Sequence, residues 1–250
     1  MVVWLAVAAY NEEQGLRHVL ERFRRQAEAA GYHGHVIVVD DGSSDGTAQA
    51  AEGWAEPVEL IRHPVNRGLG ESIQDALRAA ARLAAPGDVI VTMDADNTHP
   101  PELIPAMLDR IQAGCDVVVA SRYRRGSRVM GLSKMRLLLC YGARFLYQAL
   151  FPTPGVRDYT CAFRAYRAEM VQALFQRYGQ RPAKERDFAS MAEILLRLRC
   201  LGARISETPM VLRYDQKGGA SKMRVASTVF RTLRLALRER GAGWFGRTGE

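Results

Sequence analysis

Strand and helix patterns alternate through the first half of the sequence, and this alternation constrains the fold more than any other feature. The strand-like runs are short, apolar and rich in β-branched residues, at positions 2–7, 35–40, 58–61, 89–93 and 116–120. The helix-length segments between them span positions 13–30, 47–54, 70–84 and 101–113. Repeated strand-then-helix units form a mostly parallel sheet that helices cover on both faces. The sequence therefore predicts an α/β fold of this kind.

Polar clusters follow three of the predicted strands, at the point where each strand ends. They span residues 10–12 after the first strand, residues 40–47 after the second and residues 94–96 after the fourth. Ligands of parallel sheets bind beyond the carboxyl ends of the strands. We therefore expect the three clusters to form one site.

Two carboxylates, Asp94 and Asp96, end the fourth apolar run abruptly. Carboxylates this close repel each other unless a positive charge lies between them. A hard divalent cation that also carries phosphate oxygens meets that need. When the triplet is taken alone, an ordinary acidic loop is the better explanation. The neighbouring clusters reverse this preference and favour the metal.

The cluster at residues 40–47 has its own local chemistry. Gly42 permits a tight turn and Asp45 is suited to capping the helix that follows. Asp40 or Asp41 is then free to face the cleft and to accept hydrogen bonds from a nucleobase or a ribose hydroxyl. A turn followed by a helix cap remains the alternative for one of this pair.

Charge is distributed unevenly along the chain. Residues 1–120 hold 9 Lys and Arg against 18 Asp and Glu, whereas residues 121–250 hold 26 against 9. This asymmetry predicts an anionic partner for the second half: phosphate groups, an anionic membrane surface or nucleic acid. No nucleic-acid recognition motif or aromatic interleaving accompanies the basic residues, so we expect no nucleic-acid partner.

Other features of the sequence bear on where the protein works. The four cysteines have no CxxC spacing and are typical of reduced thiols in a cytosolic protein. No apolar stretch approaches the roughly 20 residues of a membrane-spanning helix. A length of 250 residues with 48% hydrophobic content suits one large α/β domain with a modest extension.

Several motifs, in their order and spacing, resemble family 2 inverting glycosyltransferases of the GT-A fold. They are AAYNEE, VIVVDDGSSDGT, HPVNRGLGESIQDAL, VTMDADNTHPPEL, ASRY and DYTCAFRAYR. The nearest resemblance is to polyprenyl-phosphate sugar synthases of the dolichol-phosphate mannosyltransferase type, over roughly residues 2–225. We accordingly expect a Rossmann-like GT-A catalytic domain at residues 1–220, with a nucleotide-sugar half at 1–120 and an acceptor half at 121–220.

The resemblance also implies substrates and a cofactor. The donor is a nucleoside-diphosphate sugar, GDP-mannose or a UDP-hexose, and the acceptor is polyprenyl phosphate. Mg²⁺ or Mn²⁺ is held by Asp94 and Asp96, with Thr98 where the related synthases often carry Gln, a shorter ligand that acts through water. The residues expected at the nucleotide sugar are Ala8, Tyr10, Glu12, Asp40, Asp41, Asp94, Ala95 and Asp96. Ala8 replaces a common Pro, which we expect only to loosen the turn.

The acceptor determines the rest of the predicted chemistry. An alcohol needs a carboxylate base to remove its proton. A lipid phosphate is already an anion and needs cations to bind and aim it. The second half supplies arginines for this, Arg164 among them, and the positions that the resemblance implies at the phosphates are Arg122, Arg136, Cys140, Arg213 and Lys222. Cys140 replaces a typical Ser and is a weak donor; Arg122 and Arg136 are the catalytic candidates beside the two aspartates.

Alternative functions depend on other carboxylates. Asp158 is suited to orienting an arginine or sugar hydroxyls, or to capping a turn, and Glu193 to acting as a base or joining a buried ion pair. If either is a base, the chain is a family 2 glycosyltransferase that acts on a saccharide or lipid hydroxyl. A non-catalytic nucleotide-binding or membrane-scaffolding protein is a further alternative. His99 is assigned to the His-Pro-Pro turn and not to the metal.

The end of the sequence, residues 221–250, is predicted to form a basic amphipathic helix and tail. Its apolar residues share one helical face and its arginines lie on the opposite flank, as in helices at membrane interfaces. Packing of this helix against the domain is the alternative. Residues 137–151 form a second apolar segment, suited to contact with a polyprenyl chain. We therefore expect a peripheral protein on the cytoplasmic face of a membrane. This location is compatible with a membrane-anchoring partner subunit. We expect the transferred hexose to be mannose in preference to glucose.

Overall fold

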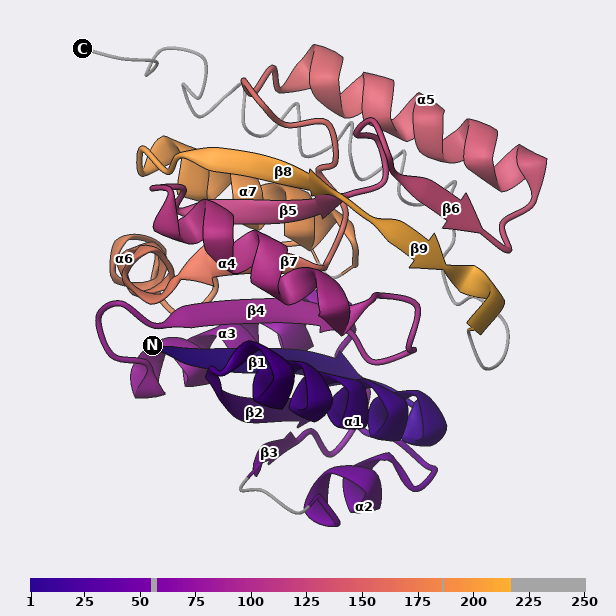
Figure 1. Ribbon diagram of the computed structural model, residues 1–250, viewed down its shortest axis with the longest axis vertical. Coiled ribbons are helices and arrows are strands. Elements are labelled where there is room, and N and C mark those ends of the chain that lie inside the picture. The colour runs from indigo at the N-terminus through magenta and orange to yellow at the C-terminus, as the bar shows by residue number, and fades with distance from the viewer. Residues whose placement is uncertain (55–57, 186, 217–250) are drawn as a thin grey trace.

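A seven-stranded sheet runs through the centre of the molecule (Figure 1). The computed structural model describes residues 1–54, 58–185 and 187–216. Across the sheet the strand order is β3-β2-β1-β4-β7-β5-β8. The strands are β1 (Val2–Ala9), β2 (His33–Asp40), β3 (Val58–Arg62), β4 (Val89–Asp94), β5 (Val117–Ser121), β7 (Arg164–Arg167) and β8 (Ile205–Pro209). Neighbouring strands are parallel except at β7, which is antiparallel to both β4 and β5.

Helices cover both faces of this sheet, with α1 and α4 over one face and α3 and α7 over the other (Figure 1). The helices are α1 (Glu13–Ala30), α2 (Thr47–Glu52), α3 (Leu69–Leu83), α4 (Ile104–Gln112), α5 (Lys134–Leu150), α6 (Ala168–Tyr178) and α7 (Ala189–Cys200). Two short strands, β6 (Arg128–Met130) and β9 (Val211–Arg213), form a separate parallel pair. The predicted α/β fold is confirmed, and the predicted strands and helices of the first half agree with the structure to within two residues at each end, with one exception. The helix predicted at 101–113 begins with a 3-10 turn, η1 (Pro101–Leu103), and α4 starts three residues later than predicted.

The core explains why the polar residues gather at one rim. All five residues of β5 and the first five of β4 are buried, because both faces of a parallel sheet are covered. Helix α1 buries Leu16, Val19, Leu20, Phe23 and Ala27, which share one helical face. The first positions at which the central strands meet solvent are therefore their ends.

Two predictions concern parts of the chain that the structure leaves undescribed. The amphipathic helix at residues 221–250 and the phosphate contact of Lys222 both lie outside the described residues. Within the described ranges, no helix has the length and apolar character needed to cross a bilayer.

Candidate active site

The three strand-end clusters meet at one rim of the sheet, as expected. Strand register sets Ala9 opposite Asp40 and Ala8 opposite Asp94, so β1, β2 and β4 end at the same level. The first two clusters are also joined by hydrogen bonds. The amide of Asn11 donates to Ser43 Oγ at 2.9 Å, and the Asn11 side-chain oxygen accepts from the Ser44 amide at 2.8 Å.

Asp40 and Asp41 are both buried. The sequence predicts instead that one of the two carboxylates is free to face the cleft. Backbone amides hold both of them. Asp40 accepts from the Ser43 amide at 2.9 Å, and Asp41 accepts from the amides of Arg67 and Gly68 at 2.9 and 2.8 Å. These bonds shape the loop around the predicted nucleoside site, and direct contact with the nucleoside stays a prediction.

The two aspartates of the fourth cluster differ in exposure and in support. Asp94 is the last residue of β4 and is partly exposed, whereas Asp96 is buried. One Asp96 oxygen accepts from the Thr98 hydroxyl at 2.6 Å and from the Thr98 amide at 3.1 Å. Thr98 therefore holds the carboxylate of Asp96 in place, which is a different contact from the water-mediated metal ligation that the sequence predicts.

The donor set at this rim suits a hard divalent cation. Asp94, Asp96 and Thr98 offer only oxygen atoms, the ligands that Mg²⁺ and Mn²⁺ prefer. Among the described residues, no group of three or more His, Cys, Asp and Glu side chains is placed to hold a metal. A cation here needs further oxygens from substrate phosphates and water, which is the usual way that proteins bind Mg²⁺.

His99 lies beside Asp94 in the same site. Its Nδ1 accepts from the Asp94 amide at 3.1 Å, so the ring proton lies on Nε2, which is 3.8 Å from Asp94 Oδ2. The ring packs on Phe163 with centroids 5.4 Å apart. His99 therefore belongs to the site wall as well as to the turn, a contact that its position five residues after Asp94 does not reveal in the sequence.

Helix α1 approaches the loop after β4 very closely. At Gly15, an added Cβ would lie 2.5 Å from the carbonyl oxygen of Ala95 and 3.0 Å from the Cα of Asp96. Both neighbours are backbone atoms, which cannot rotate away as a side chain can. The missing side chain of Gly15 is what lets the helix pack against the segment that carries both aspartates.

Replacement of Gly15 by Ala is expected to destabilise the protein, although Ala is favoured over Gly in a helix interior by about 1 kcal/mol. The added methyl group forces Ala95 and Asp96 to shift, and overpacking costs about 1–3 kcal/mol. Urea unfolding measures the sign directly. Gly142 on α5 is the control, since an added Cβ there has no atom within 4 Å and Gly142→Ala should stabilise the fold. A stabilised Gly15→Ala protein would show that the close approach imposes no constraint.

Arg122 and Asp158 form an ion pair at the end of β5, in which the Asp158 side chain is fully buried and the Arg122 side chain is 14% exposed. The guanidinium donates to both carboxylate oxygens, from Nε at 2.8 Å and from Nη2 at 2.6 Å, and the Arg122 amide adds a third bond at 3.0 Å. Burial by itself raises the pKa of Asp158, but the adjacent charge and hydrogen bonds of Arg122 outweigh it and lower the pKa. Of the roles considered for Asp158, the structure supports the orientation of an arginine.

One pocket connects Asp94 to this ion pair. Asp94, His99, Arg122 and Asp158 form its polar side together with Cys140. Its other wall is apolar and comes mainly from α5, the segment around Tyr159 and the segment before α7, through Leu139, Ala143, Tyr147, Ala162, Phe188 and Leu212. The pocket thus places carboxylates, a buried cation and an apolar surface in one space.

Two further arginines line this pocket and are not predicted from the sequence. Arg144 lies on α5 with its guanidinium 5.2 Å from the ring centre of Tyr123, and Arg157 donates to the carbonyl of Tyr123 at 3.3 Å. Arg144 follows Cys140 by four residues, so both lie on one face of α5. That spacing is the one signal in the sequence that could have identified Arg144.

The remaining predicted cations lie elsewhere. Arg136 is on α5 with its guanidinium 5.8 Å from the ring centre of Tyr214, a residue that lines the pocket. Arg213 donates its amide to the carbonyl of Thr98, while its side chain pairs with Asp215 at 2.8 Å. Arg164 is fully buried, so a phosphate contact for it is wrong. Its guanidinium donates to backbone carbonyls within the core instead.

Glu193 is buried on α7 and holds the segment before that helix. One carboxylate oxygen accepts from the amides of Lys184 and Glu185 at 2.8 and 3.2 Å, and the other lies 3.6 Å from an Arg197 nitrogen. The structure therefore supports the buried ion pair among the two roles considered for Glu193.

A mostly parallel sheet with paired carboxylates at the end of a central strand, opposite a basic pocket, defines a transferase of the GT-A fold. The glycosyl transferase family 2 model matches residues 4–175, and the chain belongs to this family. The resemblance in the sequence motifs is thereby confirmed.

Two curated relatives are similar along nearly all of the chain. A dolichol-phosphate mannosyltransferase of Pyrococcus furiosus is 29% identical over 94% of this chain, which spans 62% of that protein's length. An undecaprenyl-phosphate mannosyltransferase of Micrococcus luteus is 29% identical, with both chains covered completely. Among solved structures, glucosyl-3-phosphoglycerate synthase of Mycobacterium tuberculosis, in complex with Mn²⁺, UDP and glucosyl-3-phosphoglycerate, has a TM-score of 0.66 at 21% identity, over 94% of this chain and 79% of that one. At that identity the likeness concerns the fold alone.

Proposed function

We propose that the protein transfers a hexose, mannose in preference to glucose, from a nucleoside diphosphate to polyprenyl phosphate with inversion. The pocket carries this proposal, because it offers a cation, Arg122, beside an apolar wall. Of the two carboxylates among its described residues, Asp94 is assigned to the metal and Asp158 is engaged by Arg122. The names of the two mannosyltransferase relatives support the acceptor and the sugar. Residues 1–120 serve the donor in this proposal, and residues 121–220 serve the acceptor.

The occupied carboxylates favour phosphate over alcohol as the nucleophile. Asp158 already accepts three bonds from Arg122, and Glu193 accepts two backbone amides. A base must be within reach of the proton that it removes and have a lone pair available. A phosphate oxygen can form the bond to the anomeric carbon without deprotonation, as the bond between that carbon and the donor diphosphate breaks.

Cations orient the two phosphate groups in this reaction. Arg122, held rigidly by Asp158, meets the acceptor phosphate together with Arg144, while Arg136, Arg213 and Lys222 remain further candidates. Asp94 and Asp96 hold Mg²⁺ or Mn²⁺, which supplies Lewis-acid stabilisation of the departing nucleoside diphosphate. The fold relative was solved in complex with Mn²⁺ and UDP, which supports a metal ion in the proposed reaction. The donor is GDP-mannose or a UDP-hexose, bound by the clusters at residues 10–12 and 40–47.

Turnover of labelled nucleotide sugar tests the enzymatic proposal. Wild-type protein with Mn²⁺ and polyprenyl phosphate should convert GDP-mannose or a UDP-hexose to nucleoside diphosphate and an organic-soluble glycolipid. Omission of the lipid should abolish glycolipid formation and leave only slow hydrolysis. Absence of turnover under all donor, metal and lipid combinations would favour a non-catalytic nucleotide-binding or scaffolding protein.

Helix α5 presents an apolar face suited to a membrane surface. Met135, Leu138 and Phe145 are 65%, 67% and 62% exposed, although they are large and apolar. Arg136 and Arg144 on the same helix can meet anionic headgroups. We place the protein peripherally on a cytoplasmic membrane face, with α5 directed at the lipid and the pocket opening beside it.

Replacement of Leu138 and Phe145 by Glu is expected to weaken binding to phosphatidylglycerol vesicles by about 100-fold or more, because each side chain contributes about 1.5–3 kcal/mol when buried. Vesicle co-sedimentation measures the affinity. The control is Leu83→Glu, which adds a charge at an exposed apolar position on α3. Equal binding by the double variant and the control would exclude α5 as the membrane-facing element.

A further inference from the structure

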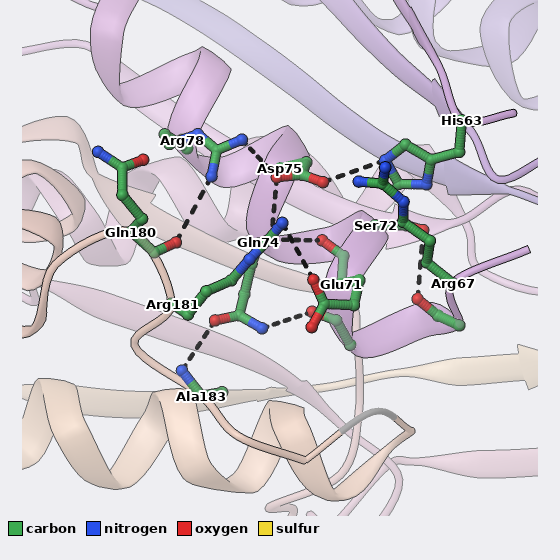
Figure 2. Close-up of polar contacts among 12 residues, drawn as sticks. His63, Arg67, Glu71, Ser72, Gln74, Asp75, Arg78, Gln180, Arg181 and Ala183 are labelled. Atoms are coloured by element: carbon green, nitrogen blue, oxygen red, sulfur yellow. Dashed lines mark hydrogen bonds and ion pairs between the residues drawn. The ribbon is translucent and has the colours of Figure 1, made fainter. Parts of the chain in front are cut away.

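A buried histidine lies between two carboxylates beneath the donor loop. His63 Nδ1 is 2.7 Å from Asp41 Oδ1. Its Nε2 is 3.0 Å from Asp75 Oδ2 (Figure 2). The histidine is 7% exposed and the side chains of both aspartates are 4% exposed. Neither ring nitrogen therefore depends on water for its hydrogen bond.

Each ring nitrogen of His63 faces an oxygen of a buried carboxylate. An ionised carboxylate can only accept hydrogen bonds, so a ring nitrogen that carries a proton donates to the carboxylate beside it. Asp41 also accepts two backbone amides, and Asp75 takes part in the ion pairs described below. His63 thus links two buried carboxylates through its ring.

Asp41 connects His63 to the donor loop. Its carboxylate also accepts the amides of Arg67 and Gly68, in the turn just before α3. That turn touches the donor loop closely, since a Cβ added at Gly42 would lie 2.6 Å from the carbonyl carbon of Val65. A carboxylate has about four lone-pair sites, and Asp41 uses three of them for His63 and the two amides. By this count one lone-pair site remains, on Oδ2.

Asp75 connects His63 to the opposite side of the molecule. It lies on α3 and accepts from Arg78 at 2.5 Å and from Arg181 at 2.9 Å (Figure 2). Arg181 also pairs with Glu71 at 3.0 Å, which gives it a second contact with α3. Burial raises the pKa of Asp75, but Arg181, Arg78 and His63 outweigh it and lower the pKa. Asp75 is therefore a fixed anion that holds the far side of the His63 ring.

We propose that His63 is a positioning residue of the donor site, which through its contact with Asp41 Oδ1 fixes the orientation of that carboxylate so that the remaining Asp41 lone pair meets the nucleoside. The role rests on the proposed function, because it presupposes a nucleoside at the donor loop. His63 does not touch the donor in this arrangement, and it acts through Asp41 alone. Replacement of His63 should therefore weaken donor binding more than it slows the chemical step.

The test replaces His63 by Gln, whose amide can donate to only one of the two carboxylates. Loss of a hydrogen bond to a charged group should raise the donor KM by about 10-fold or more. The value of kcat at saturating donor should stay close to wild type, because the lost contact stabilises the bound substrate and the transition state equally. Calorimetry with the nucleoside diphosphate and Mn²⁺ should show the same loss of affinity without any sugar transfer.

Two further variants make the test specific. His33→Gln is the matched control, because His33 is an exposed histidine at the far end of β2, and it should leave donor KM unchanged. Asp75→Asn keeps an oxygen acceptor for His63 Nε2 but removes one charge, so it should raise donor KM less than His63→Gln does. This second variant also provides the measurement if His63→Gln does not fold.

If His63 served only to stabilise the fold, His63→Gln would lower kcat in proportion to the folded fraction and leave donor KM unchanged. That result would contradict a positioning role. Equal nucleoside diphosphate affinity of wild type and His63→Gln overturns the role of His63 alone. Wild-type protein that binds no nucleoside diphosphate overturns the proposed function and this role with it.

Discussion

Replacement of Asp96 by Asn is expected to lower kcat/KM by at least about 100-fold, because a metal that stabilises the leaving group contributes several kcal/mol to the transition state. The unfolding free energy should change little. Asn keeps a carbonyl oxygen that can accept both bonds from Thr98, so the loop geometry survives. The amide nitrogen that replaces the other oxygen is not a metal ligand.

Steady-state kinetics at a series of Mn²⁺ concentrations measure this effect, and urea unfolding checks the fold. Asp109→Asn provides the matched control, since Asp109 is an exposed acid on α4, away from the rim. The control should retain wild-type kinetics. Full activity of Asp96→Asn at low Mn²⁺ would show that the Asp96 carboxylate is not a required ligand.

Replacement of Asp158 by Asn should produce the largest loss of stability, about 3–5 kcal/mol, because it leaves the Arg122 charge buried without its partner. Activity should fall as well, since Arg122 loses the two-point contact that aims it into the pocket. Asp215→Asn removes the partner of an exposed arginine, Arg213, and should have no measurable effect on stability. Urea unfolding of the two variants side by side distinguishes a buried pair from an exposed one.

The pH dependence of stability gives an independent check on the same pair. The pKa of Asp158 is lowered in the folded protein, so its contribution is fully present above the unfolded value of about 3.9 and is lost as the pH falls. Wild type should therefore lose more stability than Asp158→Asn between neutral pH and about pH 3. Parallel losses in the two proteins would mean that Asp158 is not held as a buried anion.

Local sequence patterns predict the sheet and the rim well. Strands β1, β2, β4 and β5 are short apolar runs, and polar residues stand at or just after their ends. Several of these polar residues are buried, and hydrogen bonds to loop amides satisfy Asp40, Asp41 and Asp96 there. Strand β7 is not predicted, because its four residues, Arg164–Arg167, carry a buried arginine and take their direction from both neighbours in the sheet. A central antiparallel strand of this kind has no local signature.

The sequence predicts which types of side chain form the site better than it predicts which of them contact each other. Arg122 and Asp158 are 36 positions apart, and His63 reaches Asp41 across 22 positions and Asp75 across 12. Whether a carboxylate is a base or a support depends on those partners and on burial. The arginine-rich second half predicts that cations surround the acceptor, but only the fold separates Arg122, which lines the pocket, from Arg164, which supports the core.

The central claim is that the attacking group is a phosphate that cations aim, and not a hydroxyl that a base activates. A competition assay tests it most directly, with equimolar polyprenyl phosphate and the matching polyprenol, Mn²⁺ and one labelled nucleotide sugar. The phosphate mechanism predicts that all glycolipid carries the sugar on phosphate, so that mild acid releases it. Glycosylation of the polyprenol while polyprenyl phosphate is ignored would contradict the mechanism.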